Sequence, residues 1–189
     1  FTPGDEYDVL VAMNSAALKV DLGRLRKGGI IIANTAGFDK KNLGLAGYPD
    51  GANPLEDGTL DNYKVHKIDV TKLTKECLAG STLGMKEIER SKNMFVLGLL
   101  FWMFDEPMDY TINFIKEKFA KKPDIADANI KTLKAGWNFG DHTEIFTTRF
   151  RVAPAQLPKG TYRNISGNHA TAIGLVAASE LSGLPLFLG

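Results

Sequence analysis

Four polar residues stand directly after short apolar segments of the sequence: Asn14, Ser15, Asn34 and Thr35. The segments before them, 9–13 and 30–33, are interpreted as neighbouring parallel strands. Ligands of parallel α/β sheets bind beyond the carboxyl ends of the strands, so these side chains are candidates for a binding site. Amide and hydroxyl groups there donate hydrogen bonds to a phosphate or an amide without adding charge. The structural alternative is that Asn14 or Ser15 caps a helix and Asn34 begins a turn.

The sequence lacks the common patterns of metal and nucleotide sites. Neither Gly-x-Gly-x-x-Gly nor Gly-x-x-x-x-Gly-Lys-Ser/Thr occurs in it. The histidines His66, His142 and His169 are too dispersed for a ligand set, although His169 is near the start of a predicted helix. The single cysteine, Cys77, excludes an internal disulfide or an iron–sulfur cluster held by this chain alone, and we expect it to be a small core residue. We therefore assign no catalytic residue and no metal ligand within the chain.

Charge and hydropathy argue against two classes of partner. The 23 basic and 22 acidic residues give a net charge of +1, too little for a general nucleic-acid or membrane surface. The most apolar run, 94–104, is much shorter than the ~20 residues of a spanning helix. With one cysteine and no export signal, we expect a cytoplasmic protein. The lysine cluster at 116–122 is more simply the solvated face of a helix than a docking patch for an acidic ferredoxin or a phosphate.

The elements that would position the four polar residues form a strand–helix–strand unit. Strand 9–13 is followed by a helix-compatible stretch at 15–26, and two glycines separate that stretch from strand 30–33. Such a unit is parallel and right-handed. The next segment, 34–62, is rich in turn-forming residues and is a candidate lid or interface, or a simple insertion.

A third strand and several helices are expected after this segment. The strand is predicted over 63–70, and Asp69 or Thr71 would cap the helix that follows. Asn93 precedes the most apolar part of the next helix and is expected to be a buried amide that needs partners. The alternation of 146–152 predicts an edge strand. The longer predicted helices are 86–104, 110–122 and 123–137.

A proline-punctuated connector at 153–160 predicts a domain boundary. Beyond it we expect a helix over 170–181 and a strand at 186–188. Both ends of the chain look cut, since it opens and stops close to strand-like segments. We therefore expect an excerpt from a longer polypeptide.

Several stretches resemble the 2-oxoacid:ferredoxin (acceptor) oxidoreductase family. The run Asp8-Val-Leu-Val-Ala-Met-Asn14 and the later Leu25-x-x-Gly-Gly-Ile-Ile-Ile32 resemble its gamma domain, as do Asn93-x-x-x-Leu-Gly98 and Lys122-Pro-x-Ile-Ala-x-x-Asn129. The most specific stretch is Tyr162-Arg-Asn-Ile-Ser-Gly-Asn168 with the alanine-rich helix after it. It is similar to the start of the alpha domain in fused gamma–alpha subunits of the 2-oxoglutarate type.

The resemblance implies a fold and a domain order. The fold would be α/β, a three-layer sandwich with a mainly parallel sheet, followed by the start of a thiamine-binding-type α/β domain. The gamma domain, on the coenzyme A side of the enzyme, would occupy residues 1–152 and be truncated at its N-terminus. Residues 153–160 would be the linker, and 161–189 would begin the alpha domain, of the pyrimidine-type thiamine class. The family's Tyr-Pro-Ile-Thr-Pro segment and its opening glycine-rich turn do not occur in the chain.

The resemblance also implies a reaction, in which a 2-oxoacid, by preference 2-oxoglutarate, reacts with coenzyme A to give an acyl-coenzyme A, carbon dioxide and reduced ferredoxin. Thiamine diphosphate, Mg²⁺ and an iron–sulfur cluster would belong to the full complex, chiefly through the beta subunit, and this fragment would bind none of them firmly or turn over alone. The four strand-end residues would then line a coenzyme A-facing cleft. Two alternatives stay open: a non-catalytic assembly or docking domain of such a complex, and a nucleotide-binding oxidoreductase domain with a glycine-rich turn upstream of Phe1.

Overall fold

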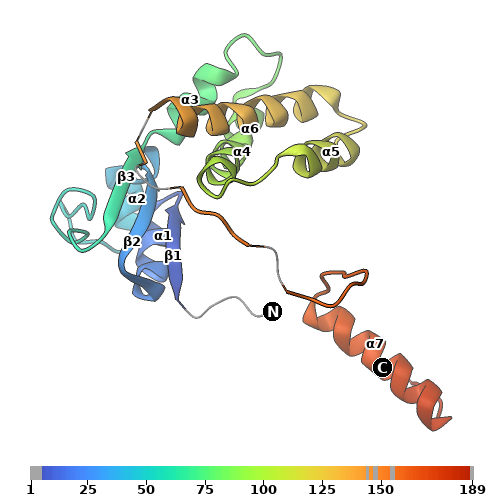
Figure 1. Ribbon diagram of the computed structural model, residues 1–189. Coiled ribbons are helices and arrows are strands. Elements are labelled where there is room, and N and C mark those ends of the chain that lie inside the picture. The colour runs from blue at the N-terminus through green and yellow to red at the C-terminus, as the bar shows by residue number, and fades with distance from the viewer. Residues whose placement is uncertain (1–5, 144, 147–148, 154–155, 188–189) are drawn as a thin grey trace. The chain divides into compact units, whose positions relative to one another are not determined.

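The structure, a computed structural model, describes residues 6–143, 145–146, 149–153 and 156–187 (Figure 1). The chain divides into two compact units, Phe1–Val152 and Ala153–Gly189, and each is described by itself. The second unit begins where the sequence predicts the linker. The assignment of the two units to a gamma and an alpha domain stays a prediction.

The first unit is built on a parallel sheet of three strands, β1 (Tyr7–Ala12), β2 (Leu25–Asn34) and β3 (Lys64–Ile68). The strand order is β1-β2-β3, with both pairs parallel. The register sets Ala12 beside Ala33 and Asn34 beside Ile68. The carboxyl ends of the three strands therefore meet at one edge, as the sequence predicted for the first two.

The connection between β1 and β2 differs from the prediction. Helix α1 (Ser15–Asp21) is shorter than expected and passes through a 3₁₀ turn (Leu22–Arg24) directly into β2. The two glycines lie inside the strand rather than before it, and the register shifts between Tyr7 and Val9. Gly28 has a φ of 76°, which favours glycine, so the pair marks a β-bulge and not the end of a helix.

Both faces of the sheet are covered, because alternate strand residues point into two separate cores. One core contains Leu10, Ala12 and Ile31 and is closed by α1 and by the segment after β2. The other contains Ile30 and Ile32 and is closed by the helices that follow β3. This arrangement is the expected α/β three-layer fold, and Figure 1 shows α1 and α2 (Lys40–Leu45) next to the strands.

The segment 34–62 is one of these layers. It begins with a 3₁₀ turn (Thr35–Gly37), continues through α2 and ends in successive turns. Its apolar side chains Phe38, Leu43, Leu55 and Leu60 are buried against the sheet. The sequence suggested a lid, an interface or an insertion and did not predict that this segment completes the core.

Four helices follow β3: α3 (Val70–Cys77), α4 (Met85–Met103), α5 (Asp109–Lys118) and α6 (Pro123–Thr143). The predicted helices are confirmed, but α5 ends four residues earlier and α6 continues six residues further than expected. Asp69 is the N-cap of α3, since its side chain accepts a hydrogen bond from the Lys72 amide at 2.8 Å.

Glycines bring α4 and α6 unusually close together. A Cβ atom added to Gly98 would lie 1.9 Å from the Leu133 carbonyl oxygen, and one added to Gly136 would lie 1.8 Å from that of Phe95. Both distances are far inside van der Waals contact, so only glycine fits at these crossing points. The two helices can therefore pack backbone to backbone.

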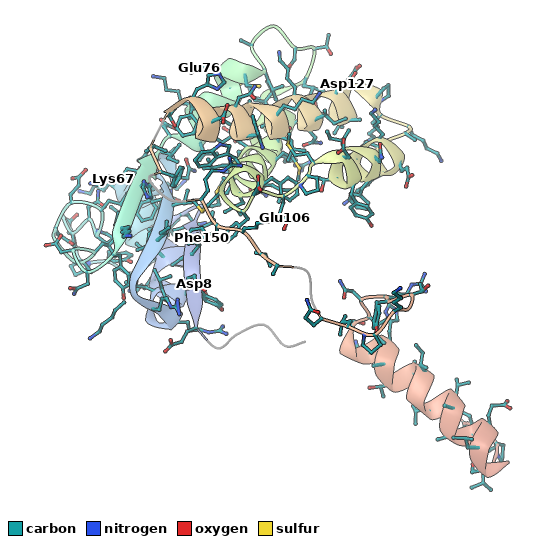
Figure 2. The ribbon with its side chains drawn as sticks, in the orientation of Figure 1. Asp8, Lys67, Glu76, Glu106, Asp127 and Phe150 are labelled. Atoms are coloured by element: carbon teal, nitrogen blue, oxygen red, sulfur yellow. The ribbon has the colours of Figure 1, made fainter. Side chains whose placement is uncertain are left out.

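The edge strand predicted over 146–152 is wrong for the residues of this stretch that the structure describes. They are held on the end of α4 instead (Figure 2): the Phe150 amide donates to the Met103 carbonyl at 2.7 Å, and the Arg149 Nε donates to that of Trp102 at 3.1 Å. Phe146 is buried between His66 and Trp102. The alternation reflects side chains anchored on a helix and not a ladder of strand hydrogen bonds.

The second unit contains helix α7 (Gly167–Ser182), longer than the predicted 170–181. Ser166 caps its start, and Gly183 ends it in the left-handed conformation with a φ of 69°. None of its residues is buried. The strand predicted at 186–188 is not formed by Leu186 and Phe187, because the described part of this unit offers no strand to pair with, and residue 188 lies outside the described residues. Among the described helices, none combines the length and apolarity needed to cross a membrane.

Candidate functional site

The four predicted site residues lie together at the carboxyl edge of the sheet. β1 ends at Ala12 and β2 at Asn34, so the pairs 14–15 and 34–35 leave neighbouring strands side by side. The Asn34 side-chain amide reaches the Met13 carbonyl oxygen at 3.3 Å, which ties the two strand ends directly. Their proximity follows from parallel pairing, as the sequence predicted.

Asn14 is the N-cap of α1. Its Oδ1 accepts a hydrogen bond from the Ala17 amide at 2.8 Å, and its extended backbone (φ −156°, ψ 171°) is typical of this position. The residue is exposed, and the hydrogen bonds among the described residues do not use its Nδ2 group. The capping function is therefore established, and a ligand-binding function of the amide is compatible with it.

Ser15 is buried, with 1% of its surface exposed. Its hydroxyl donates to the Asn42 carbonyl oxygen at 2.9 Å and so ties the start of α1 to α2. The Asn42 carbonyl oxygen also accepts a hydrogen bond from the Ala46 amide at 3.0 Å, so it stays paired without Ser15. The Ser15 hydroxyl therefore contributes mainly by fixing α1 against α2.

Asn34 is a buried amide, with 2% of its surface exposed. Besides Met13, its Nδ2 donates to the Thr71 hydroxyl at 3.2 Å, and its Oδ1 faces the Thr71 amide at 3.4 Å. It thus joins the end of β1 to the start of α3. The sequence analysis expected Asn93 to be the buried amide, and this expectation is wrong, because Asn93 lies on the exposed side of α4.

Thr35 is half-buried and begins the 3₁₀ turn after β2. In contrast to Ser15 and Asn34, its hydroxyl has no hydrogen-bond partner within the described part of the chain. Two residues later, a Cβ atom on Gly37 would lie 2.2 Å from the Met13 carbonyl oxygen. The loops after β1 and β2 are therefore in close contact, and Thr35 is held at their shared rim.

Sequence reasoning missed two members of this edge, Gly37 and Thr71. Thr71 follows the third strand, so extending the strand-end argument from two strands to three would have found it. Gly37 has no such signal, because the need for glycine arises only from the approach of the Met13 backbone.

The remaining titratable candidates are structural. His66 lies on β3 with its ring 4.3 Å from that of Phe146, and burial, with a smaller contribution from Lys64, lowers its pKa below 6.5. Cys77 is half-buried at the end of α3, and burial raises the pKa of its thiol above 9.0, so it is not an activated nucleophile. The residues described by the structure include no group of three His, Cys, Asp or Glu side chains that could hold a metal ion.

Comparison with known proteins identifies the family. Residues 1–139 match the family described as pyruvate ferredoxin/flavodoxin oxidoreductase. The chain belongs to this family. It is 50% identical over 188 residues to the 2-oxoglutarate oxidoreductase subunit KorA of Mycobacterium tuberculosis, and the alignment covers 100% of this chain and 28% of KorA.

A solved structure supports the fold. The 2-oxoglutarate:ferredoxin oxidoreductase from Magnetococcus marinus, with 2-oxoglutarate, coenzyme A and succinyl-CoA bound, is similar to 81% of this chain and 23% of its own, with a TM-score of 0.54 and 21% sequence identity. The chain thus spans about a quarter of the length of these relatives. The family resemblance recognised in the sequence is confirmed.

Proposed function

We propose that this chain is part of a 2-oxoacid:ferredoxin oxidoreductase that acts on 2-oxoglutarate. The reaction joins the acyl group of the 2-oxoacid to the sulfur of coenzyme A, releases carbon dioxide and passes two electrons to ferredoxin. The observation that supports it most is the 50% identity to KorA, which extends over both units of the chain rather than over the sheet alone. KorA carries 2-oxoglutarate in its name, and the chain takes that substrate assignment by inference.

The redox cofactors of such an enzyme would be held by residues outside this chain. A four-cysteine iron–sulfur cluster needs more than the one cysteine present, and the described residues form no metal-ligand group. Thiamine diphosphate with Mg²⁺ would supply the electron sink for decarboxylation when bound in the full complex. We infer that a beta subunit contributes these groups, and that the complex works in the cytoplasm.

We infer that Asn14, Ser15, Asn34 and Thr35 form one side of a coenzyme A-facing cleft, with two different functions. Asn14 has an exposed amide and Thr35 an unengaged hydroxyl, so these two could donate to phosphate or pantetheine amide groups. Ser15 and Asn34 are buried and fully engaged, so they would position the loops that carry the other two.

The test is an assay of the full-length chain co-expressed with its partner subunit. Reduction of a viologen dye is followed with a panel of 2-oxoacids, with and without coenzyme A. We expect reduction that needs coenzyme A and is fastest with 2-oxoglutarate. A complex loaded with thiamine diphosphate and iron–sulfur cluster that reduces no dye with any 2-oxoacid would contradict the proposal, whereas preference for pyruvate would correct only the substrate.

An assembly or docking domain is the second candidate. It is favoured by the engaged state of Ser15 and Asn34 and by α7, an apolar helix with no buried residue in the described part of its unit. It predicts that the assembled complex is active but that no strand-end substitution changes its apparent affinity for coenzyme A.

A further inference from the structure

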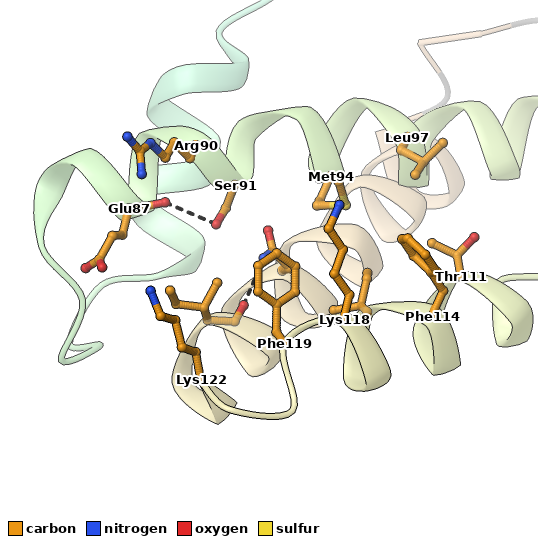
Figure 3. Close-up of a pocket in the computed structure, with 13 residues that line it drawn as sticks. Glu87, Arg90, Ser91, Met94, Leu97, Thr111, Phe114, Lys118, Phe119 and Lys122 are labelled. Carbon is orange, nitrogen blue, oxygen red and sulfur yellow. Dashed lines mark hydrogen bonds between the residues drawn. The ribbon is translucent and has the colours of Figure 1, made fainter. Parts of the chain in front are cut away.

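Helices α4, α5 and α6 enclose a cavity of about 530 Å³ on the first unit (Figure 3). Its apolar lining comes from all three helices and the turn after α5: Met94, Leu97, Phe114, Ile115, Phe119 and Ile125. The volume lies within the range of small-molecule sites. None of the lining residues belongs to the strand-end edge described above.

The rim of this cavity is positively charged. Arg90, Lys118 and Lys122 line it, and Glu87 is the one acidic lining residue. The ion pairs found among the described residues involve none of these three cations. The Glu87 carboxylate is already engaged, since it accepts a hydrogen bond from the Gly84 amide at 3.0 Å. The rim therefore carries an excess of two positive charges that the cavity itself does not neutralise.

One of the cations, Lys118, lies near two aromatic rings. The Lys118 Nζ lies 5.4 Å from the centre of the Phe114 ring and 5.8 Å from that of Phe119. Both distances are within the range of a cation–π contact. Figure 3 shows Lys118, Phe119 and Lys122 pointing from the end of α5 and its following turn toward α4. Lys118 is exposed, and its ammonium group lies beside an apolar surface.

The N-terminus of α6 adds to the same field, whereas that of α4 is already capped by the Glu87 carboxylate. Glu87 and Arg90 lie in the first turns of α4, and Lys122 immediately precedes α6. A helix N-terminus carries a partial positive charge that favours an anion nearby. A half-exposed aromatic ring completes the site, because 49% of the Phe114 surface remains accessible.

We propose that this cavity binds a small dianion carried on a flat apolar group, such as the phosphate monoester of an aromatic compound. The apolar part would lie on Met94, Leu97 and Phe114, and the anion would be bound by Lys118 and Lys122 at the rim. The ligand needs both a phosphate and an aromatic surface. Water competes with an anion alone at the open rim, and the apolar lining alone does not distinguish a charged ligand from a neutral one.

The test is a titration of the full chain labelled with ¹³C at its methionine methyl groups, using 1-naphthyl phosphate as the probe. The Met94 signal is assigned by its loss in Met94→Leu, and Met103, which is fully buried in the other core of α4, reports on any general change in conformation. We expect the Met94 signal to shift saturably while that of Met103 stays in place. Neutral 1-naphthol and inorganic phosphate should each bind at least tenfold more weakly.

Matched double variants distinguish the rim lysines from lysines elsewhere on the same helix and turn. The pair Lys118→Gln and Lys122→Gln should raise the dissociation constant at least tenfold, whereas Lys116→Gln with Lys121→Gln removes the same charge from exposed positions outside the lining and should change it less than twofold. A Met94 signal that does not move up to the solubility limit of the probe would overturn the proposal, as would equal binding by both double variants. The readout needs no turnover, so it is independent of the proposed enzymatic function.

Discussion

The carboxyl edge of the sheet and the cavity between α4, α5 and α6 use polar groups in opposite ways. At the sheet edge the buried polar side chains are bound to the chain itself, as Asn34 is to Met13 and Thr71. At the cavity the charged side chains surround an apolar surface, and the Lys118 ammonium group lies near the rings of Phe114 and Phe119. The polar groups of the first region hold loops in place, whereas the lining of the second region carries two more cations than anions.

This difference shows that a site deduced from strand ends contains two kinds of residue: side chains that hold the loops in place and side chains whose donors are available to a ligand. Parallel sheets bring polar residues together at this edge whether or not a ligand binds there, because the loops leaving the strands must be fastened. Only side chains with unengaged donors, here Asn14 and Thr35, remain to contact a ligand. The predictions below test the two regions and the core that supports them, from the largest expected effect to the smallest.

The largest effect is expected where α4 crosses α6. The change Gly136→Ala places a methyl group 1.8 Å from the Phe95 carbonyl oxygen, so the helices that carry the cavity must move apart. We expect the free energy of unfolding to fall by about 3 kcal/mol, measured by urea denaturation. Gly44→Ala, in α2 with open space around the new methyl, is the control and should cost nothing or stabilise by up to about 1 kcal/mol. Equal effects of the two changes would refute the close helix contact.

A smaller effect separates the buried amide from the exposed one. Asn34→Ala removes the amide that joins Met13 to Thr71 and leaves the Met13 carbonyl unpaired, so we expect a loss of about 2 kcal/mol in the free energy of unfolding. Asn93→Ala removes the same group from the exposed side of α4 and should change stability by less than about 0.5 kcal/mol. If Asn93→Ala proved the more harmful change, the assignment of the buried amide would be reversed.

The smallest effect concerns pH. Burial lowers the pKa of His66 in the folded chain, so below pH 6.5 the unfolded chain binds a proton that the folded chain does not. Stability should therefore fall as the pH drops from 6.5 toward the lowered pKa of the folded state and be unaffected by His66 at higher pH. His66→Gln should remove this part of the pH dependence when urea denaturation is compared at pH 7.5 and 5.5. An unchanged pH dependence in the variant would show that His66 is not the responsible group.

Much of the fold was predictable from the sequence for local physical reasons. Continuous apolar segments with a helix between them indicated the parallel pair β1–β2, and the apolar content of 94–104 indicated that α4 passes through the core. The errors came from tertiary contacts. Gly28 and Gly29 suggested an interruption but form a bulge, and Phe146 and Phe150 suggested a strand but pack on α4 and β3.

The position of the candidate site in the fold was predictable, and the hydrogen bonds of its side chains were not. The strand ends gave Asn14, Ser15, Asn34 and Thr35, since parallel pairing is a local inference. Which of these side chains is already hydrogen-bonded within the chain depends on partners far away in sequence, such as Asn42 for Ser15 and Thr71 for Asn34. No sequence pattern marks these pairs, and the cavity cations likewise looked like an ordinary solvated helix face.

The central claim is that the strand-end edge contacts coenzyme A, and its most direct test is the apparent KM for coenzyme A of the assembled complex. The double variant Asn14→Asp, Thr35→Val keeps a capping acceptor on α1 and removes both available donors, while Asn93→Asp with Thr82→Val makes the same changes at exposed positions on and before α4. We predict that the apparent KM for coenzyme A rises about three- to tenfold in the first variant only, with that for the 2-oxoacid unchanged. An unchanged KM for coenzyme A, or an equal rise for both substrates, would contradict the account.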